Sequence, residues 1–103
     1  IMKQSGLDYA VNWSHSGDPF LTEKKDLLNA CAIAIKEELG VTAEISTDGG
    51  TSDGRFMAKI CDQVIEFGLI NESIHKINEH TTISALDDVT KVYISMLNKL
   101  LAK

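Results

Sequence analysis

The spacing of apolar residues changes several times along this chain, and these changes constrain the fold more than any other feature. Residues 7–13 and 41–46 alternate between apolar and polar positions, which is typical of half-buried strands. Residues 64–68 give a third strand. Amphipathic helical patterns follow each strand, over 22–39, 52–60 and 84–100. The order strand, helix, strand, helix, strand, helix predicts an α/β fold with its loops gathered at the strand ends.

End signals accompany the two long helical patterns. Thr22 is placed to cap a helix that runs to Leu39, and Gly40 follows as the residue that ends it. Ser84 and Asp87 form a capping-box pattern before the final helix. The side chains expected to face inward are Leu28, Ala32, Ile35 and Leu39 in the first helix, Phe56, Met57 and Ile60 in the short one, and Leu86, Val89, Val92 or Tyr93, Met96 and Leu100 in the last.

Length and charge limit the class of protein. A chain of 103 residues provides one domain or part of one, and its opening in the middle of an apparent element indicates a fragment. A net charge of -5 without a basic cluster argues against nucleic acid as a partner, and no apolar run is long enough to span a membrane. Cys31 and Cys61 are expected to be free thiols, with Cys31 a small core residue. We therefore expect a soluble, cytoplasmic protein.

The loop 46–56 concentrates glycines, hydroxyls and charged groups between the second strand and the short helix. Arg55 is suited to clamp a carboxylate, with Gly50 and Thr51 adding hydrogen bonds to the same anion. If the sheet is parallel, this loop and the loop 71–80 open at one edge, where α/β proteins bind ligands. An ordinary polar turn with an exposed arginine fits the pattern equally well, and both interpretations stay open.

The second polar loop contains two histidines and two further acidic residues. His75 and His80 are five residues apart and do not form a self-contained zinc motif. Glu72 and Glu79 are candidates for catalytic carboxylates, although exposed loop acids are far commoner. The residues alone therefore favour no metal site here.

Three runs resemble the co-catalytic zinc metallopeptidase family that includes acetylornithine deacetylase and carboxypeptidase G: Ser46 to Phe56, Val64 to Gly68, and Asn71 with Ile74 to Glu79. The run from Trp13 to Thr22 fits the same family, so the resemblance covers essentially the whole chain. It implies that residues 18–103 are the C-terminal part of a catalytic domain. Residues 1–17 would then be the last strand of an inserted lid and dimerisation domain, with its hinge, in a homodimer.

The resemblance also implies an activity and a cofactor. The family motif implies hydrolysis of N-succinyl-LL-2,6-diaminopimelate to succinate and LL-diaminopimelate, in bacterial synthesis of lysine and diaminopimelate. Hydrolysis of another N-acyl amino acid, as by acetylornithine deacetylase, is the alternative. Two zinc ions with a bridging water and a glutamate general base would perform the reaction.

Carried over by motif, His75 is a zinc ligand, and the substrate-binding residues are Gly50, Thr51, Arg55 and Asn71. Leu69 departs from the family by replacing a proline. The other zinc ligands and the general base have no counterpart in these residues, so we expect the isolated chain to be inactive. A further possibility is a non-catalytic fragment that self-associates or swaps domains through the strand at 7–13.

Overall fold

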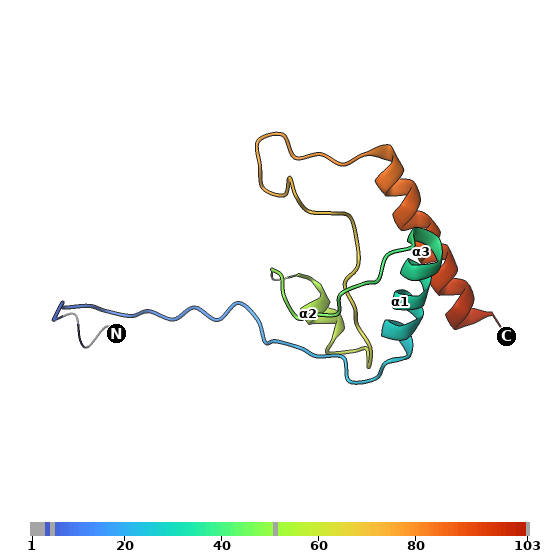
Figure 1. Cartoon of the computed structure of the whole chain (residues 1–103). Coiled ribbons are helices and arrows are strands. Elements are labelled where there is room, and N and C mark those ends of the chain that lie inside the picture. Colours follow the sequence, from blue (N-terminus) through green and yellow to red (C-terminus); the bar gives the residue numbers. More distant parts are fainter. Residues whose placement is uncertain (1–3, 5, 51, 103) are drawn as a thin grey trace.

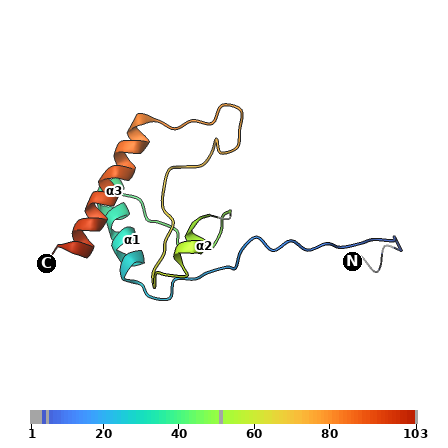
Figure 2. The same cartoon turned by 180° about the vertical axis from the view of Figure 1, so that it is seen from behind.

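The computed structural model describes residue 4, residues 6–50 and residues 52–102. These residues form three helices: α1 (Asp26–Leu39), α2 (Gly54–Met57) and α3 (Ile83–Leu101). Helices α1 and α3 lie side by side at one end, and the residues before α1 extend away from them as a long arm (Figure 1). The view from behind shows the same arrangement, with α2 between the arm and the helix pair (Figure 2).

The core of the described residues lies between α1 and α3, and its buried side chains are hydrophobic. Its buried members are Ala30, Cys31, Ala34, Ile35, Val92 and Met96. Small alanines on α1 allow the two helices to approach closely, and Val92 fills the contact with no exposed surface. An ion pair of 2.6 Å between Lys99 Nζ and Glu37 Oε2 joins the same helices outside the core.

The expected inward-facing residues are only partly confirmed. Ile35, Val92 and Met96 are buried as expected. The prediction is wrong for Leu86 and Leu100, and for the three apolar residues expected to face inward in the short helix, Phe56, Met57 and Ile60, which are all exposed. Helix α2 is only one turn long and has no buried residue, so it has no face to pack against α1 or α3.

Helix α1 ends as predicted but begins later. Gly40 has a left-handed φ of 70° and its N–H donates to the Lys36 carbonyl, which is the expected glycine end. The helix begins at Asp26, so the prediction of Thr22 as its cap is wrong. The Thr22 hydroxyl instead bonds both backbone groups of Val64, accepting its N–H at 3.0 Å and donating to its carbonyl.

The start of α1 is fixed by residues far along the chain rather than by a local cap. Gln63 Oε1 accepts the Leu27 N–H at 2.9 Å, which satisfies one of the free donors of the first turn. Beside it, Lys24 Nζ lies 2.5 Å from Asp62 Oδ2. This hydrogen bond lowers the pKa of the Asp62 carboxyl and raises the pKa of the Lys24 ammonium. Three contacts thus attach residues 62–64 to residues 22–27.

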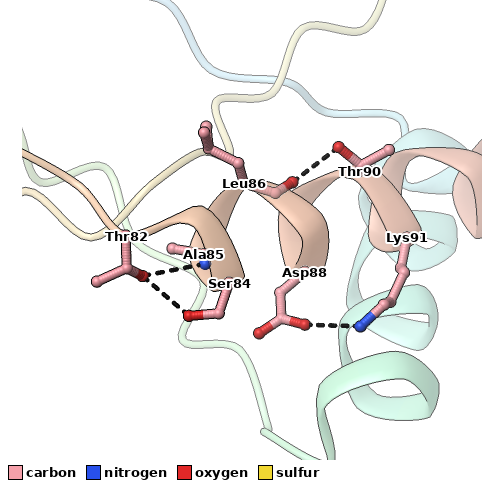
Figure 3. Close-up of polar contacts among 7 residues, drawn as sticks. All are labelled: Thr82, Ser84, Ala85, Leu86, Asp88, Thr90 and Lys91. Carbon is pink, nitrogen blue, oxygen red and sulfur yellow. Dashed lines mark hydrogen bonds and ion pairs between the residues drawn. The ribbon is translucent and has the colours of Figure 1, made fainter.

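Helix α3 begins at Ile83, and its N-cap lies two residues before the predicted cap, Ser84. Thr82 has extended backbone angles, and its hydroxyl accepts the Ala85 N–H at 3.1 Å (Figure 3). The Ser84 hydroxyl lies 3.0 Å from the same Thr82 oxygen instead of capping the helix. Thr82 is therefore the N-cap, and the predicted capping box is wrong.

The three predicted strands are not formed in the part of the chain that the structure describes. Residues 7–13, 41–46 and 64–68 are irregular chain without a β partner. A strand is maintained by backbone hydrogen bonds to a neighbouring strand, and the described residues provide none to these segments. The structure therefore does not bear out the α/β arrangement, which stays a prediction.

Two further findings concern the cysteines and the apolar character of the helices. Both cysteines are free; Cys31 is buried, and burial raises the pKa of its thiol, whereas Cys61 is exposed. Among the helices of the described ranges, none has the length and apolar character required to cross a bilayer.

Candidate functional site

Arg55 is the best-defined of the predicted binding residues. It lies on α2, and its guanidinium carbon is 4.7 Å from the centre of the Phe56 ring, which is a cation–π contact. Its aliphatic stem packs on Gly17, where an added Cβ would lie 2.8 Å from Arg55 Cδ. Glycine at position 17 therefore allows the hinge predicted within residues 1–17 to contact the loop 46–56, which we call the glycine loop. The sequence did not reveal this contact.

The charged end of Arg55 has no protein counter-ion among the residues that the structure describes. Its Nε is buried and has no hydrogen-bond partner in this part of the chain. A buried donor without an acceptor is costly, and the carboxylate of a ligand is the acceptor that a guanidinium binds best. The local chemistry thus suits binding of an anion.

The loop before Arg55 is tied to the segment 64–68. The Ser52 hydroxyl donates to the Glu66 carboxylate and accepts the Gly54 N–H at 3.1 Å. Ser52, Glu66 and Gly17 were missed as site residues in the sequence. The only available signal for Glu66 was a charge within an otherwise apolar run.

An open hollow lies beside this loop. Its lining residues come from the glycine loop, from the segment 64–68 and from α3, and include Ser52, Glu66, Phe67 and Tyr93. The Tyr93 hydroxyl donates to the Phe67 carbonyl at 2.7 Å, and their rings are 5.9 Å apart. This contact attaches α3 to the segment that carries Glu66.

The remaining predicted substrate contacts are less constrained. Gly50 is exposed, and an added Cβ there would meet no atom within 4 Å. Asn71 is also exposed, and its carbonyl accepts the Ile74 N–H at 3.1 Å. Thr51 lies outside the described residues. No hydrogen bond or ion pair joins Gly50, Arg55 and Asn71 to one another.

His75 has an unusual backbone. Its φ is 60°, the only positive φ of a non-glycine residue in the described ranges. The loop around it is closed by Ser73, whose hydroxyl donates to the His80 carbonyl at 2.8 Å and accepts the His80 N–H at 3.1 Å. The His75 ring is exposed and makes no hydrogen bond with the described residues, whereas His80 Nδ1 lies 2.5 Å from the Asn78 carbonyl. His75 therefore presents an accessible imidazole.

The described residues do not make up a complete metal site. The described residues contain no group of three or more His, Cys, Asp or Glu side chains arranged around one point, whereas a protein zinc site uses three or four such ligands. His75 fits the role of one ligand. The loop 71–80 also lies away from α2 in both views (Figures 1 and 2).

Known proteins match the chain along almost its whole length. The model of peptidase family M20/M25/M40 matches residues 6–99. The chain is 54% identical over 102 residues to a succinyl-diaminopimelate desuccinylase of Ralstonia pickettii and 55% identical over 102 residues to those of Burkholderia mallei and Burkholderia pseudomallei. These matches cover 99% of this chain but 26% or 27% of the relatives. The chain therefore spans about a quarter of the length of the curated relatives it matches.

Proposed function

We propose a function from one premise, which is that this chain belongs to peptidase family M20/M25/M40. The proposed function is hydrolysis of N-succinyl-LL-2,6-diaminopimelate, performed by a longer zinc-dependent, cytoplasmic, homodimeric bacterial enzyme of which this chain is the C-terminal quarter. Water is added across the amide, which releases succinate and LL-diaminopimelate. The identity of 54% to a relative named for this activity, over 99% of the chain, carries the proposal.

In this proposal the chain binds and orients, and it does not catalyse alone. Arg55 binds a substrate carboxylate, which agrees with its lack of a counter-ion in the described residues. Gly50, Thr51 and Asn71 add substrate contacts, and His75 supplies one zinc ligand. The isolated chain is inactive because one imidazole does not hold a zinc ion in a catalytic site.

The α/β fold belongs to the same proposal. The segments 41–46 and 64–68 have strand patterns but lack strand partners among the described residues. We place their partners in the remaining three quarters of the longer protein, as part of the catalytic domain. Residues 1–17 would join a lid and dimerisation domain.

A chimera tests this function with the chain's own residues. In the Ralstonia pickettii relative, the matching 102 residues are replaced by this chain, and hydrolysis of N-succinyl-LL-2,6-diaminopimelate is measured with added zinc. We expect the chimera to be active and the isolated 103-residue chain to be inactive under the same conditions. Zinc-dependent turnover by the isolated chain would refute its proposed inactivity.

The acyl group is tested in the same assay. Succinyl-diaminopimelate and N-acetylornithine are compared at equal concentrations with the unaltered relative as the control. A folded chimera that prefers the acetyl substrate would replace the proposal with the deacetylase alternative, and a folded chimera that hydrolyses neither substrate would contradict both.

Self-association is a second candidate property, favoured by the exposure of the arm. Leu7, Tyr9, Val11 and Trp13 have 72%, 50%, 45% and 93% of their surface exposed. Such a segment invites pairing with the same segment of a second copy. We expect sedimentation equilibrium to show a concentration-dependent dimer that Val11→Lys weakens. Asn12→Lys, on the opposite face of the predicted strand, is the matched control, and a monomer at high concentration would count against the pairing.

A further inference from the structure

We propose that Glu66 is a positioning residue, which holds Arg55 in place through Ser52 and so determines how tightly the substrate carboxylate is bound. The inference rests on the proposed role of Arg55. It assigns Glu66 no contact with the substrate and no part in the chemical step.

A continuous set of hydrogen bonds leads from Glu66 to the residue before Arg55. The Glu66 carboxylate accepts the Ser52 hydroxyl, across 14 residues of sequence. The Ser52 oxygen in turn accepts the N–H of Gly54, which is the first residue of α2. The position of the single turn that carries Arg55 therefore depends on the orientation of the Ser52 hydroxyl.

The accepting oxygen of Glu66 determines that orientation. A serine hydroxyl has one proton to donate and two lone pairs with which to accept. An ionised carboxylate only accepts, so it takes the proton of Ser52 and leaves a lone pair directed to the Gly54 N–H. Without Glu66 the hydroxyl is free to rotate, and the Gly54 N–H loses a fixed acceptor.

Close packing limits any other movement of this turn. A Cβ at Gly54 would lie 2.7 Å from Glu66 Oε1, 3.1 Å from Phe20 Cζ and 3.1 Å from Ser52 Oγ. The Arg55 stem also contacts Gly17. Contacts with Gly17 and with the segment 64–68 thus both limit movement around Arg55, and Glu66 makes the polar contact from that segment.

Glu66 is exposed, so a role in the hydrophobic core does not explain it. A charged side chain at the solvent surface contributes little to the free energy of unfolding unless it has a specific partner. The partner here is Ser52, and the hydrogen bond between Ser52 and Glu66 fixes the turn that carries Arg55. A change at Glu66 is therefore expected to alter binding more than stability.

Steady-state kinetics of the chimera test the inference. Glu66→Ala is expected to raise KM for N-succinyl-LL-2,6-diaminopimelate about 10-fold, with kcat changed less than about 3-fold, because a hydrogen bond to a charged group is lost away from the reacting atoms. Glu66→Gln should restore a KM near the original value, because its amide oxygen also accepts from Ser52. Glu44→Ala, which removes an exposed carboxylate without a hydrogen bond to the described residues, is the matched control and should leave KM unchanged.

A double-mutant cycle separates positioning from a general structural effect. In an Arg55→Ala background, Glu66→Ala should raise KM no further, since the residue it positions is gone. An undiminished effect in that background, an unchanged KM for Glu66→Ala, or a failure of Glu66→Gln to restore KM would each overturn the inference.

Amide exchange of the 103-residue chain gives a readout that does not need catalysis. Glu66→Ala should accelerate hydrogen exchange at the Gly54 N–H, and Glu66→Gln should not. An inactive unaltered chimera would overturn the proposed function, and the exchange rates would then decide the positioning alone. Equal Gly54 exchange rates in the Glu66→Ala and unaltered chains would overturn it.

Discussion

Replacing His75 with asparagine is expected to lower kcat of the chimera by at least about 100-fold, because the proposed zinc ligand is lost. Mutating a residue that only hydrogen-bonds a metal ligand already costs about 10- to 100-fold, and losing the ligand itself should cost more. Asparagine is chosen because it adopts the positive φ that His75 has, so the loop backbone is retained. Zinc content of the purified variant, measured together with kcat, should fall below that of the unaltered chimera. A change in kcat with full zinc content would indicate a different role for His75.

His80→Asn is the matched control in the same loop. The His80 ring contacts the Asn78 carbonyl and is not a proposed ligand, so this variant should retain kcat within about 3-fold and its zinc content. Equal losses in the two variants would assign the effect to the loop structure instead of the imidazole. Full activity of the His75→Asn chimera would remove His75 from the metal site.

Local signals predicted the parts of the fold that depend on neighbouring residues. Gly40 ends α1 because glycine adopts the left-handed conformation that the helix end requires. Val92 and Met96 are four residues apart on α3 and share the face that packs on α1. Such features depend on a few consecutive residues, so the sequence determines them without knowledge of the partner segment.

Features that depend on distant residues were predicted poorly. Thr22 has the side chain of a helix cap, but it bonds Val64, and Gln63 supplies the acceptor at the start of α1. The choice between these two arrangements depends on where the segment 62–64 lies. Sequence spacing does not contain that information.

In the candidate site, too, features set by neighbouring residues were predicted and features set by distant residues were not. The residue types in the glycine loop suggested anion binding by Arg55, and its lack of a counter-ion in the described residues agrees with that prediction. The two contacts that support Arg55 join residues that are distant in sequence. Gly17 lies 38 residues before Arg55, and Ser52 lies 14 residues before Glu66, so neither contact produces a local sequence pattern. A predicted strand forms only beside a neighbouring strand. In our proposal the neighbouring strands of 41–46 and 64–68 belong to the rest of the longer protein.

Val92→Asp is expected to destabilise the α1–α3 pair by about 3–5 kcal/mol, because it places a carboxylate without a partner in a position that has no exposed surface. Such a cost is a large part of the 5–15 kcal/mol that stabilises a typical domain. Urea unfolding of the 103-residue chain, followed by circular dichroism at 222 nm, measures it. We expect a clear fall in the urea midpoint or complete loss of the helical signal.

Ile94→Asp separates burial from helix propensity. Ile94 lies two residues away on α3 with 56% of its surface exposed, so the same substitution there should cost less than about 1 kcal/mol. If both variants shift the midpoint equally, the helical content of α3 and not its packing on α1 would account for the stability. A large loss confined to Val92→Asp would mean that the two helices form a folded unit in the isolated chain, able to hold the segment of Glu66 through the Tyr93–Phe67 contact.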